Sequence, residues 1–251
     1  MERTAIGAAG GGAAIIRPQR LGTVVMVEII ERIARGELPK GALLPTETEL
    51  QTEFGVSRTA LREGLKAVEE RGMIAIRQGR GAVVLPVTEW NVLDPFVLTP
   101  LLDHHPTPEM YEQLNAFRMM LEPDMARLAA ARISEQDLGR LAELLTVMAT
   151  EFDDPDAFLE HDLLFHSVIA DAAGNLLARA IMTGIEQPLR SSRRLTNRIP
   201  RSLEKAQESH SAIHRCLAGK DGEGAAAAMR EHLSWSHDRL LGSWEGPASH
   251  S

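Results

Sequence analysis

The stretch LLPTETELQTEFGVSRTALREGLKAVEERG, residues 43–72, decides the fold of the amino-terminal third of this chain. Thr46 and Glu49 form a capping box, which opens a short helix that runs through residue 54. Gly55 then turns the chain, and Ser57 caps the next helix, which runs to about residue 71. Two short helices joined by a tight, glycine-containing turn predict a helix-turn-helix.

The sequence on both sides of this stretch completes a winged helix-turn-helix. Upstream, a helix is predicted at 21–34, where apolar residues recur at helical spacing: Val24, Val27, Ile30 and Ile33. Downstream, two β-rich runs, 73–76 and 82–85, are joined by the basic, glycine-rich segment 77–81, which predicts a hairpin. We therefore place a winged helix-turn-helix domain at residues 20–86.

The third predicted helix has the chemistry of a DNA-recognition helix. Its exposed start presents Ser57, Arg58, Thr59 and Arg62, and its inward face carries Leu61, Leu65 and Val68. A helix amino terminus suits a phosphate, and each arginine that bonds guanine contributes about 1–3 kcal/mol of discrimination. The hairpin tip adds Gln78, Gly79 and Arg80. A helical subdomain with solvated arginines is the alternative, but three ordered helices with a basic wing favour double-stranded DNA as the partner.

Composition sets the class of protein. The 251 residues are 44% hydrophobic and 25% charged, which is typical of a folded protein with a core. The net charge is −8, yet residues 1–85 carry 12 Lys/Arg against 10 Asp/Glu, so the acidic excess lies in the rest of the chain. The single cysteine suits a reducing compartment, and no apolar run reaches the ~20 residues that span a membrane. We expect a cytoplasmic protein with a disordered tail at 1–19 and a second tail at 243–251.

Beyond a connector at 87–105, helical patterns run through residues 106–242 and predict an all-α bundle of six or seven helices. Polar residues interrupt three of the apolar stripes: Asp162 and His166 one turn apart, then His210, then His232. Three imidazoles and a carboxylate around a divalent metal would satisfy all four. Two alternatives stay open: each histidine is simply hydrogen-bonded, or His214 replaces His210.

The amino-terminal motifs resemble the winged helix of the GntR family. The resemblance lies in LLPTETEL (43–50), FGVSRTALRE (54–63), Leu65, Gly72 and GRGA (79–82). It implies that Arg58 and Arg62 contact bases or nearby phosphates, and that the wing glycine touches the minor groove. Many members carry arginine where this chain has Thr48, a departure that bears on the operator sequence.

The carboxy-terminal section resembles the FCD domain of the FadR-type branch of that family. The resemblance covers nearly everything from residue 86 to 241 and includes Arg118, the LEP motif at 121–123, Gly174-Asn175 and the histidine motifs. It implies a metal held by Asp162, His166, His210 and His232, and an effector carboxylate bound by Arg118. The alternative for Arg118 is an ion pair with Glu122. Asn175 and Arg190 are added as effector candidates. Two alternatives stay open for the basic cluster of Arg190, Arg193 and Arg194: it lines the same pocket or, as the sequence favours, it lies on a solvated face.

Together these features predict a homodimeric repressor, not an enzyme, that binds a short inverted repeat. Zinc is the preferred metal, with nickel or manganese as alternatives, and a small organic acid would complete its coordination. Residues 90–95 resemble the connector of sugar-acid regulators, so an aldonate or hexuronate is the preferred effector. Two rivals remain: a metal-dependent hydrolase, for which no general base is evident, and a DNA-binding protein with a purely structural metal.

Overall fold

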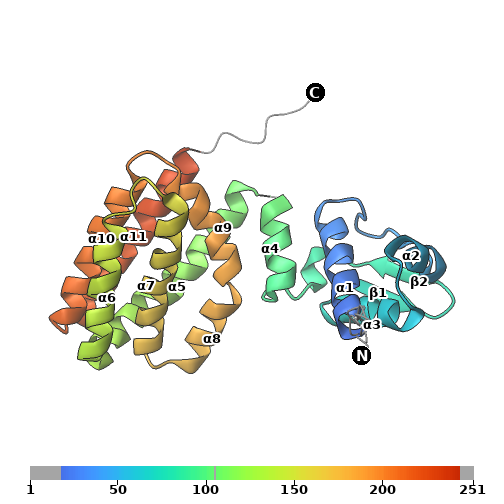
Figure 1. Ribbon diagram of the computed structural model, residues 1–251, viewed down its shortest axis with the longest axis horizontal. Helices are drawn as coiled ribbons and strands as arrows, with labels where there is room; N and C mark the ends of the chain where they lie inside the picture. The colour runs from blue at the N-terminus through green and yellow to red at the C-terminus, as the bar shows by residue number, and fades with distance from the viewer. Residues whose placement is uncertain (1–17, 105, 244–251) are drawn as a thin grey trace, which may run out of the picture. The chain divides into compact units, whose positions relative to one another are not determined.

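The computed structural model describes residues 18–104 and 106–243, and the chain divides after Trp90 into two compact units (Figure 1). Helix α1 begins at Pro18, so it includes the last two residues of the predicted tail at 1–19. The rest of that tail, and all but the first residue of the tail predicted at 243–251, lies outside the described residues. Every helix within the described ranges is too short or too polar to cross a membrane.

The first unit is a winged helix-turn-helix, as predicted. Its elements are α1 (Pro18–Ala34), α2 (Glu47–Phe54), α3 (Arg58–Glu70), β1 (Ile74–Arg77), β2 (Gly81–Val84) and the 3-10 helix η1 (Val87–Glu89). The two strands are antiparallel, with Ile74 opposite Val84. The segment before α2 lies along the free edge of β2, where the Leu44 N–H donates to the carbonyl of Ala82 at 2.9 Å.

The ends of α2 and α3 follow the signals in the sequence. Thr46 and Glu49 make both hydrogen bonds of the capping box. Gly55 ends α2 in the left-handed conformation, with φ of 62°, which glycine adopts without strain. The Ser57 hydroxyl then accepts a hydrogen bond from the backbone N–H of Ala60 and caps α3. Local capping chemistry therefore fixes where α3 begins.

Helices α1 and α3 pack closely because Gly64 has no side chain: a Cβ there would lie 2.6 Å from Val25 Cγ1. The predicted stripe on α1 is wrong at Val24, which is 62% exposed while Val25 is buried. The buried face is wider than the spacing indicated and includes Val25, Met26, Ile29, Ile30, Ile33 and Ala34. The predicted inward residues of α3 are confirmed as buried: Leu61, Leu65 and Val68.

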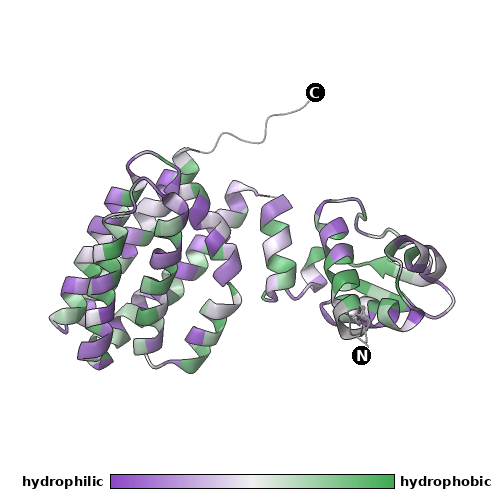
Figure 2. Cartoon of the chain, in the orientation of Figure 1, coloured by the Kyte–Doolittle hydropathy of each residue, from purple (hydrophilic) through white to green (hydrophobic). Residues whose placement is uncertain are grey.

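The second unit is all-helical, as predicted. Its helices are α4 (Pro95–His104), α5 (Pro108–Arg132), α6 (Glu135–Met148), α7 (Pro155–Ala172), α8 (Leu176–Gly184), α9 (Glu186–Asn197), α10 (Ser202–Ala218) and α11 (Gly222–Gly242). Seven of these helices, α5 to α11, lie within residues 106–242, in agreement with the six or seven expected there, and α4 lies within residues 87–105, which we expected to be a connector. In both units hydrophobic residues gather on the faces that helices turn toward their neighbours (Figure 2).

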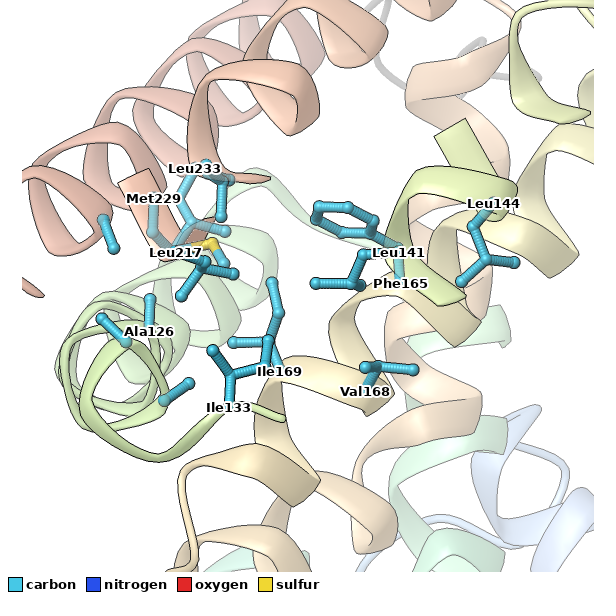
Figure 3. Close-up of a cluster of buried hydrophobic side chains, with 14 residues drawn as sticks. Ala126, Ile133, Leu141, Leu144, Phe165, Val168, Ile169, Leu217, Met229 and Leu233 are labelled. Atoms are coloured by element: carbon cyan, nitrogen blue, oxygen red, sulfur yellow. The ribbon is translucent and has the colours of Figure 1, made fainter. Parts of the chain in front are cut away.

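A hydrophobic cluster joins α5, α6, α7, α10 and α11 (Figure 3). Phe165 and Ile169 of α7 point toward Leu217 of α10 and Leu233 of α11, and all four are at most 2% exposed. Such close packing resists displacement of its elements. The cluster therefore fixes the relative positions of α7, α10 and α11, which carry the predicted metal ligands.

Candidate metal centre and DNA-binding surface

Four predicted ligands meet inside the second unit. Asp162 and His166 lie one turn apart on α7, His210 lies on α10 and His232 on α11. All four are at most 7% exposed, and one ligand atom from each lies within 4.8 Å of the others. The alternative residue His214 lies outside this group, because its Nε2 contacts the carbonyl of Leu138 at 3.2 Å. The structure therefore brings together the set inferred from the sequence.

The imidazoles of this group have unused nitrogens. Within the described part of the chain, His166 Nε2, both ring nitrogens of His210 and His232 Nδ1 have no hydrogen-bond partner. His210 Nε2 lies 3.2 Å from Asp162 Oδ1, which is close enough for an ion pair, but the two groups are not aligned for a hydrogen bond. Leaving a buried polar atom unpaired costs about 1–3 kcal/mol, so such a concentration calls for a further partner. One carboxylate and three imidazoles fit a divalent transition metal ion.

The electrostatics of the group suit metal ligation. Burial, followed by the Arg193 guanidinium, lowers the pKa of His166 to about 4. Burial and the nearby His210 ring also lower the pKa of His232 well below its usual range. Burial alone would raise the pKa of Asp162, but Arg193 and His210 hold it well below its ordinary value. His166 and His232 are therefore neutral and Asp162 is ionised at neutral pH, which are the forms that bind a metal.

Glu122 on α5 connects this group to Arg118. Its Oε2 lies 2.6 Å from His166 Nδ1, and its Oε1 accepts a hydrogen bond from Arg118 Nε at 2.6 Å. Burial would raise the pKa of Glu122, but Arg118 and His166 hold it well below the usual range, so the carboxylate only accepts. His166 must then donate through Nδ1, which leaves the lone pair of Nε2 facing the other ligands. Sequence reasoning treated Glu122 only as a partner of Arg118 and missed this contact.

The sequence favoured a solvated face for Arg193 on α9, but the structure buries this residue. It is 6% exposed, and its Nη1 lies 2.7 Å from Asp162 Oδ2. The signal lay in its spacing: Leu189, Arg193 and Thr196 share one face of α9 and are buried. Arg190, which we had proposed for the effector, instead makes an ion pair with Glu160 at the surface.

A cavity opens beside the candidate metal centre. Arg118, Asp162, Arg193 and His232 line one part of it, and its remaining wall includes Tyr111, Leu114, Asn115, Ser192, Thr196, Asn197, Ser202 and Trp235. Arg118 Nη2 has no hydrogen-bond partner among the residues that the structure describes. Asn175, another predicted effector residue, is exposed and caps α8 through its Oδ1, which accepts from the Ala178 N–H. The structure thus brings Arg118 to the cavity but neither Asn175 nor Arg190.

The candidate DNA-binding residues are all exposed in the first unit. They are Ser57, Arg58, Thr59 and Arg62 at the start of α3, and Gln78, Gly79 and Arg80 at the tip of the β1–β2 hairpin. Gly79 has φ of 73°, a left-handed conformation that a side chain would strain. The exposed residues form the charged helix start and glycine turn that the sequence predicted.

Glu47 of α2 joins the two arginines of this surface, a contact that the sequence did not reveal. Its carboxylate accepts from Arg58 Nε at 3.3 Å and from Arg62 Nε at 3.1 Å. The hydrogen bond from Arg62 is the main cause of the lowered pKa of Glu47. Both bonds use Nε, so each guanidinium retains terminal N–H groups for another acceptor.

In comparisons with known proteins, each of the two units matches a protein family. Residues 21–84 match the bacterial regulatory proteins of the gntR family, and residues 113–234 match the FCD domain. The chain is 31% identical over 218 residues to the HTH-type transcriptional regulator LutR of Bacillus subtilis (strain 168), covering 85% of this chain and 98% of that protein. It is 28% identical over 221 residues to the galactonate operon transcriptional repressor of Escherichia coli (strain K12), covering 86% and 95%.

A solved structure agrees in fold. This structure is that of Lar, which controls the expression of the Listeria monocytogenes agr system. The two structures match with a TM-score of 0.60 and a sequence identity of 19%, and the match covers 89% of this chain and 98% of the Lar chain. The matched families and relatives are transcription regulators, not enzymes, which excludes the metal-dependent hydrolase. The chain is a transcription regulator that belongs to the GntR family of bacterial regulatory proteins, and its second unit carries an FCD domain.

Proposed function

We propose that this regulator is a repressor that binds an inverted-repeat operator as a homodimer, and that a metal ion and a small organic acid in the FCD domain control this binding. The observation that carries the proposal is the buried group Asp162, His166, His210 and His232, with its unpaired ring nitrogens. An aliphatic core needs no such group at this position, and four buried polar side chains are costly without a shared partner.

The four residues of this group would hold the ion. Zinc is the first choice for one carboxylate and three imidazoles, with nickel and manganese as alternatives. When bound, the ion supplies a buried positive charge and a Lewis acid for an anionic ligand. The protein prepares the ligands: Glu122 accepts from His166 Nδ1, and Arg193 keeps Asp162 ionised.

The organic acid would bind in the adjacent cavity, with its carboxylate facing Arg118. Glu122 holds Arg118 through Nε, so the unpartnered Nη2 is already oriented to donate to a carboxylate. The E. coli relative is named as the repressor of a galactonate operon, and this supports an aldonate or hexuronate as the effector. Arg193 joins Arg118 in the cavity wall and adds positive charge there.

The operator would be bound by the exposed start of α3 and the hairpin tip. Arg58 and Arg62 would reach bases in the major groove, Ser57 and Thr59 would contact phosphates, and the segment 78–80 would lie against the neighbouring backbone. Single winged-helix heads make few contacts, so tight binding requires two heads on two half-sites. A homodimer on an inverted repeat meets that requirement.

Thermal denaturation tests the sensor. The protein is stripped with a chelator, reloaded with zinc, nickel or manganese, and heated with galactonate, gluconate or galacturonate. We expect the metal to raise the melting temperature and an acid to raise it further only in the loaded protein. The same acid should release inverted-repeat DNA selected from a random library. Failure to take up any of the three metals contradicts the metal centre, and stabilisation by metal alone supports the purely structural role.

A further inference from the structure

The turn between α9 and α10 places two buried polar side chains on the wall of the cavity. Asn197 is the last residue of α9 and is 9% exposed, and Ser202 is the first residue of α10 and is 2% exposed. Both line the cavity that Arg118 and His232 also line. In the described ranges, Asn197 Nδ2 and Ser202 Oγ have no hydrogen-bond partner. Buried polar groups are normally hydrogen-bonded, so these two atoms are expected to bind a polar partner.

The backbone of this turn is held in an uncommon conformation. Arg201 has φ of 63° and ψ of 13°, the left-handed region that non-glycine residues rarely adopt. The Arg239 side chain of α11 donates to the carbonyl of Pro200 at 3.2 Å, and the Ser202 N–H donates to that of Ile199 at 3.1 Å. Arg201 provides no side-chain cap for α10, and Ser202 follows the cap position, so its hydroxyl is not used to begin the helix.

The hydrogen-bonding chemistry of Asn197 Nδ2 and Ser202 Oγ indicates which kind of ligand group they would bind. An amide nitrogen donates, and a serine hydroxyl both donates and accepts. Ligand hydroxyls suit both groups, because a hydroxyl can accept from Asn197 Nδ2 and can donate to or accept from Ser202 Oγ. Neither side chain carries a charge, so a carboxylate buried against them would gain no counter-charge from them.

We propose that Asn197 and Ser202 form a hydroxyl-binding subsite, which makes the cavity select acids that carry a hydroxyl group over aliphatic acids of similar length. This inference rests on the proposed function, since the acid must occupy the same cavity. An aliphatic acid that fills the cavity leaves both groups buried and unpaired. Sites built to bond a ligand hydroxyl reject analogues that lack it strongly. We expect a preference of about 10- to 100-fold for the hydroxylated acid.

Calorimetry on the zinc-loaded full chain tests the subsite. The probes are galactonate, gluconate and galacturonate, compared with hexanoate, which has six carbons and no hydroxyl, and with adipate, which has two carboxylates. The variants are Asn197→Leu and Ser202→Ala. Ser211→Ala is the matched control, because Ser211 on α10 bonds the carbonyl of Gln207 in its own helix and lies outside the cavity lining.

The parent and the Ser211 control should bind at least one hydroxylated acid at least tenfold more tightly than hexanoate. In each cavity variant that affinity should fall about 10-fold or more, while hexanoate affinity stays unchanged, so the ratio of the two constants falls. This ratio is measured within one sample and is insensitive to a fraction of misfolded variant. Equal binding of hexanoate by the parent, tightest binding of adipate, or variants with the parent's ratio would overturn the subsite and leave the proposed function standing. If no acid binds the loaded protein, the proposed function itself fails, and the subsite with it.

Discussion

Replacing Glu122 by Gln removes one negative charge from the buried network and leaves the size of the side chain unchanged. The amide has one oxygen and one NH2 where the carboxylate has two acceptors. If the oxygen stays on Arg118 Nε, the NH2 faces His166 Nδ1, which must then accept. The proton of His166 moves to Nε2, the nitrogen that faces Asp162 and the other ligands, and that nitrogen can no longer bind a metal.

This geometry gives the expected loss of stability and the expected loss of metal affinity. Arg118 and Glu122 are 5% and 4% exposed and 2.6 Å apart, and breaking a buried pair of this kind costs about 3–5 kcal/mol. Gln retains one hydrogen bond, so we expect a loss near the lower end, about 3 kcal/mol. For a domain the size of the second unit this lowers the melting temperature by roughly 6–12 °C. Metal affinity should fall about 10- to 100-fold, as it does when the partner of a ligating histidine is lost.

The matched control is Glu160→Gln. Glu160 also pairs with an arginine, Arg190, but its side chain is 56% exposed. Exposed pairs contribute about 0–1 kcal/mol. Thermal denaturation in chelator would measure stability, and competition against a chromophoric zinc chelator would measure metal affinity. If the Glu122 and Glu160 variants were equal in both measurements, the assignment of Glu122 as the residue that orients His166 would be wrong.

Four further outcomes are expected. Arg58→Ala and Arg62→Ala should each weaken operator binding by about 1–3 kcal/mol in a gel-shift titration, without changing sensor stability; parental affinity in both would show that another element reads the bases. Glu47→Gln should weaken operator binding but strengthen binding to random DNA, because it frees both arginines and removes a charge that repels phosphate; a specificity ratio equal to the parent's counts against Glu47 as their positioning residue. His210→Ala should reduce metal content in elemental analysis, and His214→Ala should not; the reverse result would place the ligand one turn further along α10. Light scattering without DNA should return twice the monomer mass at micromolar concentration, and a monomer would contradict the homodimer.

Sequence signals located the features that depend on local chemistry. The Thr46 capping box, the turn at Gly55 and the Ser57 cap each act within four residues, so the pattern alone predicts them and the structure confirms them. The candidate metal ligands could be predicted because two of them, Asp162 and His166, lie one turn apart on the same helix.

The residues that surround the four candidate metal ligands are brought there by contacts between helices that lie far apart in the sequence. Glu122 reaches His166 across 44 positions, and nothing local distinguishes it from a helix ion pair with Arg118. Arg193 lies in a row of arginines, and only the rotation of α9 about its own axis buries it while leaving Arg190 at the surface. The spacing from Leu189 indicates which face of α9 carries Arg193, but which residues that face contacts is set by packing against other helices.

Different helices supply the candidate metal ligands and the neighbouring polar wall of the cavity. The four candidate metal ligands come from α7, α10 and α11, whereas Ser192, Thr196 and Asn197 all come from one face of α9. A face of a single helix can be changed by a few substitutions that leave the candidate metal ligands on the other helices untouched. Diversification within the family, and the engineering of biosensors for new metabolites, therefore has a short stretch to work on. Under the proposed function, a library that varies residues 192, 196 and 197 should alter which acid the protein binds without changing its metal content.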